Sequence, residues 1–188
     1  MKALFIGLGS IGQRHLRNLK KLRPDIDIMA VRSQRVAPVL SDSNQVVNGA
    51  NIQDYYGLLE FDSIHEALSS KPDIVFVTNP SSMHIDATKE ALKSDAFIFI
   101  EKPISHNYDG VEELIKIEKS IGLNKIFVGY QFRFHPALKL VKKILKEKVI
   151  GNIVGAQLVN GEYLPNWHPY EDYRLSYASR KDLGGGAI

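Results

Sequence analysis

The feature that most constrains the fold is a glycine-rich turn that follows an apolar run and precedes an amphipathic helical pattern. Residues 3–6 are all apolar and stop at Gly7, which is typical of a strand buried on both faces of a parallel sheet. Residues 11–22 place leucines on one face and basic side chains elsewhere, and Pro24 closes this helix. A second apolar run, residues 26–31, completes the pattern, so the chain is predicted to open with a βαβ unit.

The same alternation continues to about residue 130. Strands are predicted at 73–77, 96–100 and 125–130, and helices at 62–69, 81–92 and 109–120. Ser81 or Ser82 is the expected cap of the helix at 81–92. Strands that alternate with helices of about a dozen residues predict an α/β fold with a Rossmann-type, doubly wound parallel sheet. Residues 33–61 are rich in Ser, Asn, Gln and Asp, and we assign no elements there.

The alternation changes after residue 130, and we place a domain boundary there. Residues 1–130 are expected to form the Rossmann domain, and residues 131–188 the start of a second α/β domain. The second region contains one helix at 136–148, a turn at 151–152, a strand-like run at 153–163 and a polar, aromatic loop through Tyr177. The chain stops in a glycine run after Leu183, so we expect this second domain to be incomplete.

The glycine turn has the spacing of a dinucleotide-binding fingerprint, G-x-G-x-x-G, in the strand–helix context that this fingerprint requires. Gly7 permits the tight turn, Gly9 lets the backbone approach a pyrophosphate, and Gly12 allows close contact between helix and strand. The amides of Ser10 and Ile11 would face the anion at the positive end of the helix. We therefore predict dinucleotide binding; the alternative is a glycine turn that only joins a strand to a helix.

The end of the second predicted strand bears on the choice of cofactor. NAD-binding sites usually place a carboxylate about twenty residues beyond the fingerprint, where it binds the ribose 2′-hydroxyl. This chain has Arg32 and Ser33 there, with Arg35 close by and no carboxylate. Arginine and serine suit a 2′-phosphate, so the sequence favours NADP(H) over NAD(H). The alternative is that Arg32 is an ordinary solvated arginine.

Polar residues follow the strand predicted at 73–77. Ligands of doubly wound sheets bind beyond the carboxyl ends of the strands, so Thr78, Asn79 and Pro80 are expected to line the crevice on the cofactor side. His84 falls about one turn into the next helix. A single histidine is more often structural than functional, but its place here makes it a candidate cofactor-binding residue.

Glu101 and Lys102 follow the next predicted strand, and Pro103 would fix the turn that holds them. We predict that Glu101 lies at the cofactor site. A lysine at the mouth of a strand can donate a hydrogen bond to a substrate hydroxyl or carbonyl and stabilise developing negative charge. Lys102 is therefore the candidate catalytic residue, and the alternative is a loop lysine that only meets solvent.

Composition excludes several other classes. With no cysteine among 188 residues, disulfides, zinc–thiolate sites and cysteine nucleophiles are ruled out, and the histidines show no metal-ligand spacing, so no metal is expected. The net charge of +3, from 24 basic and 21 acidic residues, is too small and too scattered to indicate nucleic-acid binding. No apolar run approaches the length of a membrane span, so we expect a cytoplasmic protein without a membrane partner.

Taken together, the motifs resemble the Gfo/Idh/MocA oxidoreductases, the family of glucose–fructose oxidoreductase and inositol 2-dehydrogenase. The resemblance rests on the order GLGSIGQRHLRNL, TNPSSMHIDATKEAL, EKPIS, GYQFRFHPAL and GGGAI, which runs along essentially the whole chain. It implies a Rossmann domain followed by an α/β domain with a large, mostly antiparallel sheet, and a sugar, inositol or nucleotide-sugar substrate between them. It also implies that Lys102 orients the substrate hydroxyl beside the nicotinamide and that Gln131 and Arg133 lie near the substrate cleft.

Family enzymes continue after the GGG-A segment with an aspartate and a histidine, and that histidine acts as acid and base. This chain ends at Ile188, so we expect a truncated NAD(P)-dependent oxidoreductase that binds cofactor but turns over substrate poorly or not at all. The alternative is a non-catalytic dinucleotide-binding sensor or regulator, because the family includes a repressor with this fold; a methyltransferase ranks third. A homo-oligomer is possible for the full-length protein, since relatives commonly pair through the sheet of the second domain.

Overall fold

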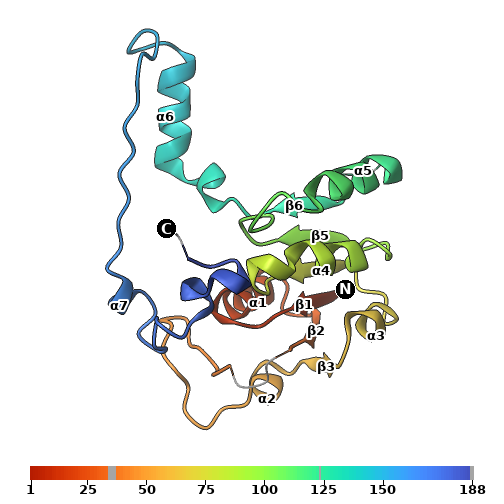
Figure 1. The fold of residues 1–188 in the computed structure, drawn as a ribbon. Coiled ribbons are helices and arrows are strands. Elements are labelled where there is room, and N and C mark those ends of the chain that lie inside the picture. The colour runs from red at the N-terminus through yellow and green to blue at the C-terminus, as the bar shows by residue number, and fades with distance from the viewer. Residues whose placement is uncertain (34–36, 123, 187–188) are drawn as a thin grey trace.

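The computed structural model describes residues 1–33, 37–122 and 124–186. Within them, six parallel strands form one sheet in the order β3-β2-β1-β4-β5-β6 (Figure 1). The strands are β1 (Lys2–Ile6), β2 (Asp27–Val31), β3 (Leu59–Phe61), β4 (Ile74–Val77), β5 (Phe97–Ile100) and β6 (Ile126–Val128). This strand order is that of the Rossmann fold, which confirms the predicted doubly wound sheet.

Helices connect the strands and cover the sheet. In the first 130 residues they are α1 (Ser10–Leu22), α2 (Ile52–Tyr56), α3 (Ile64–Leu68), α4 (His84–Ala91) and α5 (Val111–Ile121), with a 3₁₀ turn, η1 (Ser81–Met83), before α4. They are followed by η2 (Gln131–Phe134), α6 (Pro136–Lys146), α7 (Leu164–Trp167), η3 (Tyr177–Ser179) and η4 (Lys181–Leu183). None of the helices in the described residues is long and apolar enough to cross a membrane.

The strands bury apolar side chains on both faces, as their unbroken apolar runs predict. In β1, Leu4 and Ile6 belong to a core shared with α3, α4 and α5, whereas Ala3 and Phe5 belong to a second core shared with α1 and α2. Packing on both sides fixes the register of β1 between β2 and β4. After β3 the chain crosses to the other half of the sheet, where β4 pairs with β1. The carboxyl ends of β1 and β4 therefore form the switch point where ligands bind in such sheets.

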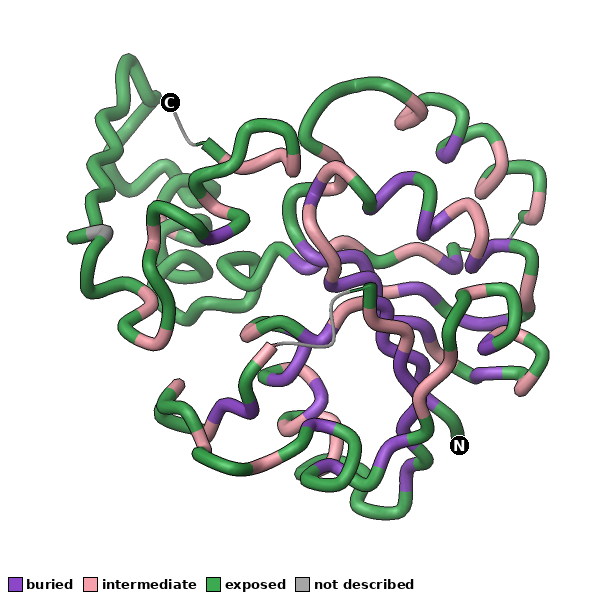
Figure 2. The backbone as a smooth tube through the Cα atoms, turned by 60° about the horizontal axis from the view of Figure 1, so that its bottom comes forward, coloured by how far each residue is buried: buried purple, intermediate pink, exposed green. Residues whose placement is uncertain are grey.

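Two local predictions were wrong. The cap predicted at Ser81 or Ser82 does not form, because both residues lie in η1, and α4 follows with Met83 at its N-cap and no side-chain cap bond. The strand predicted at 153–163 is also missing from the described structure, where this run is exposed and adopts no strand (Figure 2). A strand needs a neighbour to pair with, and this extended run descends alone from α6 (Figure 1).

Candidate functional site

The glycine turn is pressed against the loop that follows β4. Gly7 has a φ of +93°, and a Cβ on it would lie 2.8 Å from the Asn79 backbone. A Cβ on Gly12 would lie 2.5 Å from the carbonyl oxygen of Gly7, which is closer than atoms can approach. By contrast, a Cβ on Gly9 would meet nothing within 4 Å among the described residues. Gly7 and Gly12 are therefore required by packing, whereas the space beside Gly9 is open.

Thr78 ties the two loops together. Its hydroxyl donates to the carbonyl oxygen of Gly7 at 2.6 Å, and the residue is buried at the end of β4. This bond fixes the glycine turn to β4 across the switch point. The Thr78 side chain, predicted to lie on the cofactor side, thus serves as a clamp within the protein.

The first turn of α1 is suited to an anion. A helix leaves its first N–H groups without partners in the helix, and the N-cap here is Gly9, which has no side chain to cap them. The amides of Ser10 and Ile11 belong to this set, and no acidic residue stands in the first turn. The positive end of the helix dipole adds to the attraction, so this turn can hold a phosphate group.

His84 lies at the first position of α4 and is almost fully buried. Its Nδ1 lies 2.8 Å from the carbonyl oxygen of Pro103, and its Nε2 lies 2.9 Å from that of Asn79. Burial lowers the pKa of His84, and the hydrogen bonds to the two carbonyls offset part of this shift. Because both ring nitrogens face the protein's own backbone, His84 joins the loops after β4 and β5 and does not reach outward.

Glu101 is likewise held within the protein. One carboxylate oxygen lies 2.8 Å from Nε2 of His15 on α1, and the other accepts the backbone N–H of Lys102 at 2.9 Å. The imidazole of His15 also packs edge-on against Phe99, with ring centroids 4.9 Å apart. Glu101 thus anchors the start of the loop after β5, while the Lys102 side chain is exposed and makes no hydrogen bond to the described residues.

Asn79, Gln131 and Arg133 are the other polar candidates at this edge of the sheet. The side-chain oxygen of Asn79 is buried and has no hydrogen-bond partner among the described residues. Gln131 and Arg133 are exposed in η2, directly after β6. Pro80 precedes η1 and is half-buried. Since β4, β5 and β6 are adjacent and parallel, these residues and Lys102 follow the carboxyl ends of neighbouring strands.

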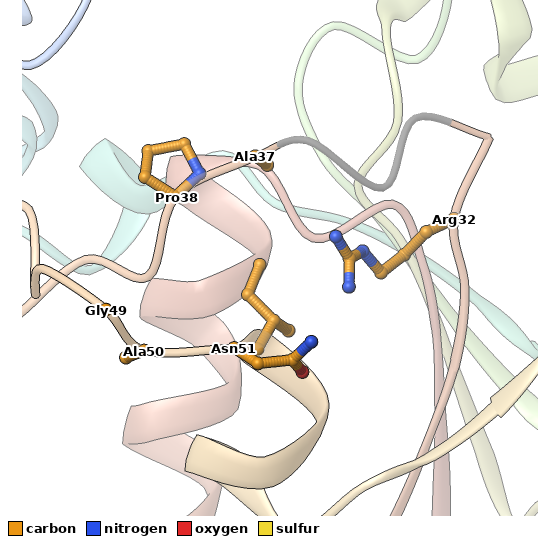
Figure 3. A pocket seen from close by; sticks show the side chains of 7 residues that line it. Arg32, Ala37, Pro38, Gly49, Ala50 and Asn51 are labelled. Atoms are coloured by element: carbon orange, nitrogen blue, oxygen red, sulfur yellow. The ribbon is translucent and has the colours of Figure 1, made fainter.

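Arg32, at the end of β2, faces a hollow of about 300 Å³ (Figure 3). The hollow is lined by Arg32, Ala37, Pro38, Gly49, Ala50, Asn51 and Ile52. The guanidinium Nη1 of Arg32 lies 3.5 Å from a carboxylate oxygen of Glu60 in β3, and the two side chains are only 5% and 11% exposed. The charge of Arg32 is therefore offset inside the protein. Ser33 is exposed beside it, and Arg35 lies outside the described residues.

Sequence reasoning missed Gln13, His15 and Glu60. Gln13 is fully buried; its side-chain amide donates to the carbonyls of Leu8 and Pro38, and its oxygen accepts the N–H of Leu40. A polar side chain on the buried face of α1, directly after the glycine turn, is a signal that could have pointed to this role. His15 and Glu60 carried no such local signal. The described residues contain no cluster of side chains that could hold a metal ion.

Known proteins resemble this chain in sequence. A family model described as the oxidoreductase family with an NAD-binding Rossmann fold matches residues 1–130. The chain is 30% identical over 148 residues to the uncharacterized oxidoreductase YrbE of Bacillus subtilis, covering 78% of this chain and 40% of that protein. It is 26% identical over 153 residues to an inositol 2-dehydrogenase/D-chiro-inositol 3-dehydrogenase of Lactiplantibacillus plantarum, covering 80% of this chain and 41% of that protein.

A solved structure agrees at the level of the fold. The myo-inositol dehydrogenase of Lactobacillus casei, in complex with NAD(H) and myo-inositol, superposes with a TM-score of 0.67 and 22% identity. The match covers 80% of this chain and 42% of that chain. The chain thus spans about two fifths of the length of the relatives it matches.

Proposed function

Because the chain belongs to the Gfo/Idh/MocA oxidoreductase family, we propose that it binds NAD(H) at the carboxyl edge of its sheet and serves hydride transfer to or from a hydroxyl or ketone of a sugar, polyol or nucleotide sugar. The observation that carries this proposal is the juxtaposition of the open glycine turn at Gly9 with the exposed Lys102, across the loop that contains Asn79. We also propose that residues 1–130 form the cofactor domain and that residues 131–188 belong to the substrate domain.

The residues at this edge fit a dinucleotide. The amides of Ser10 and Ile11 would donate to the pyrophosphate, and the absence of a side chain at Gly9 lets the phosphates approach the backbone. The buried oxygen of Asn79 is an acceptor that a ribose hydroxyl or a carboxamide N–H would satisfy. When bound, the nicotinamide accepts or supplies the hydride.

Lys102 is the residue that we assign to the substrate. Its ammonium would donate a hydrogen bond to the reacting oxygen and stabilise negative charge there. Glu101 fixes the Lys102 backbone, and His84 holds the carbonyl of Pro103, so we assign both as positioning residues. Gln131 and Arg133 would contact the hydroxyl or phosphate groups of the substrate from η2.

Two features argue for NAD(H). The family description is NAD-binding. The carboxylate of Glu60 lies beside Arg32 and would repel a 2′-phosphate that approached Arg32. Neither feature supports the NADP(H) preference that the sequence suggested. Ser33 would face the ribose whose 2′ position distinguishes NAD(H) from NADP(H). We expect NADH to bind at least about tenfold more tightly than NADPH, measured by nicotinamide fluorescence, and Glu60→Gln to narrow this ratio by freeing Arg32. Tighter binding of NADPH to the unaltered chain would contradict the assignment.

The proposal is tested by combining cofactor binding with turnover on inositols, hexoses and nucleotide sugars. Lys102→Ala should leave the NADH dissociation constant within about twofold while turnover falls by about 10²-fold or more. Lys116→Ala, an exposed lysine of α5, is the matched control and should change neither quantity. Absence of NADH binding would exclude the function altogether. NADH binding without turnover on any of these substrates, even in a chain extended beyond Ile188, would favour the sensor or regulator.

A further inference from the structure

Residues 168–186 return to the carboxyl edge of the sheet after the exposed run that follows α6. Figure 1 shows this segment, in dark blue, beside α1 and α4. The hydroxyl oxygen of Tyr177 lies 2.8 Å from the hydroxyl oxygen of Ser81, which is buried in η1. Ser81 directly follows the loop of Asn79 and Pro80, so a residue nearly a hundred positions away is attached to the proposed cofactor loop.

A second contact lies at Gly184. This residue has a φ of +82°, and a Cβ on it would lie 2.7 Å from the Cβ of His106 and 3.0 Å from the backbone nitrogen of Ser82. The backbone of Gly184 is therefore seated directly on the loops after β4 and β5. A side chain here would clash and would also be strained by the left-handed backbone, so the glycine run permits this docking.

Residues 174–186 are held together by hydrogen bonds of their own. The N–H of Gly185 donates to the carbonyl of Arg180 at 2.9 Å, and that of Gly186 donates to the carbonyl of Ala178 at 2.7 Å. The hydroxyl of Ser179 donates to the carbonyl of Arg174 at 2.8 Å. These bonds define a compact unit that can keep its shape against the sheet edge.

The other end of the segment lies near the glycine turn. Tyr170 is half-buried, and its hydroxyl is near the side chain of Ser10 at the start of α1. Burial raises the pKa of Tyr170, and the neighbouring Ser10 side chain offsets part of this shift. Ser10 and Ser81 stand on the two halves of the sheet, and a dinucleotide bound at the switch point passes between them.

We propose that residues 168–186 are a cover of the dinucleotide site, attached to the nicotinamide half through Tyr177 and Gly184, with Tyr170 near Ser10 at the phosphate half. This inference rests on the proposed binding of NAD(H). The cover retains the bound dinucleotide by lying across its path of release.

The test compares Tyr177→Phe with Tyr163→Phe, whose tyrosine is 72% exposed in the run before the cover. We expect Tyr177→Phe to raise the NADH dissociation rate in stopped flow about threefold to tenfold, as expected for one lost hydrogen bond. AMP lacks the nicotinamide half, so its dissociation constant should be the same for Tyr177→Phe as for the unaltered chain. Tyr163→Phe should change neither value.

A second variant, Gly184→Ala, removes the docking by a different route and should accelerate NADH release at least as much as Tyr177→Phe. An unchanged NADH dissociation rate in both variants would contradict the proposal that residues 168–186 retain the dinucleotide. Tighter NADH binding in either variant would show that these residues block the site instead. Failure of the unaltered chain to bind NADH would refute the proposed function and the cover with it. If the unaltered chain binds NADH and both variants release it at the same rate, only the role of residues 168–186 is refuted.

Discussion

The imidazole of His84 bridges the carbonyl oxygens of Asn79 and Pro103, at 2.9 and 2.8 Å, and so joins the loops that follow β4 and β5. One loop carries the buried oxygen that we assign to the cofactor, and the other carries Lys102. A single buried side chain therefore sets the spacing between the proposed cofactor and substrate groups. With this arrangement, His84 would act on the proposed site without reaching into it.

His84→Leu should destabilise the chain and impair the site together. The carbonyl that accepts the imidazole N–H loses its donor in a buried place, which costs about 1–3 kcal/mol of unfolding free energy. Turnover should fall as well, because the Lys102 loop loses its attachment. His84→Gln keeps a side-chain amide that can donate to one carbonyl and should recover part of both losses. Urea unfolding and steady-state kinetics measure the two effects; equal stability of His84→Leu and the unaltered chain would refute the bridge.

The pH dependence of stability follows from the same residue. The pKa of His84 is lowered in the folded chain, with burial as the main cause, so the unfolded chain binds a proton more readily. The contribution of His84 to stability is therefore complete above its unfolded pKa of about 6.5 and is lost as the pH falls below it. We expect the stability difference between the unaltered chain and His84→Gln to shrink from pH 7.5 to pH 5.5 in thermal unfolding. A difference that grows on acidification would contradict the sign.

The sheet could be predicted because its signal is local. Runs such as residues 3–6 and 74–77 are apolar without interruption, and this pattern, bounded by turn residues, is typical of strands buried on both faces. The glycine turn was equally predictable, since its G-x-G-x-x-G spacing lies between a strand and a helix of one βαβ unit, although the Asn79 backbone that Gly7 packs against lies outside that unit. The strand at 153–163 failed because apolar and β-branched residues show that a strand can form, but pairing depends on a neighbour that local sequence does not reveal.

The side-chain partners of the site could not be predicted. His15 meets Glu101 across 86 positions, and Arg32 meets Glu60 across 28, and both pairs depend on which strands lie side by side. The sequence identified Arg32 correctly as a charged group at the end of β2. It could not show that β3 brings a carboxylate to the same place, and this is what changes the expected cofactor.

Gly9 and Gly12 should respond differently to alanine. Gly12→Ala places a Cβ 2.5 Å from the Gly7 carbonyl, so the turn must shift, and we expect a loss of about 1–3 kcal/mol in unfolding free energy. Gly9→Ala meets open space at an ordinary φ of −66° and should cost less than about 1 kcal/mol. Its methyl group would nevertheless stand where the phosphates approach, so NADH affinity should fall about tenfold or more. Retained affinity in Gly9→Ala would place the pyrophosphate elsewhere.

The run at 151–163 should be the first site of limited proteolysis. It is exposed throughout and forms no regular element in the described structure, so a protease can bind it without unfolding the sheet. Chymotrypsin is expected to cleave near Leu158 or Tyr163 well before it cleaves within residues 1–130. Mass spectrometry of the early fragments measures this order. Early cleavage inside the sheet, with residues 151–163 intact, would mean that this run is protected in solution.

Glu101 should affect turnover through the backbone of Lys102 rather than through the cofactor. Glu101→Ala removes the acceptor of the Lys102 N–H and the partner of His15, so we expect about 1–3 kcal/mol of lost stability and at least about tenfold lower kcat. Glu101→Gln retains one oxygen acceptor and should lose less of both. The NADH dissociation constant should stay within about twofold in either variant, because the glycine turn is held separately by Thr78. If NADH affinity falls in parallel with kcat, Glu101 contacts the cofactor, and its role as a positioning residue is wrong.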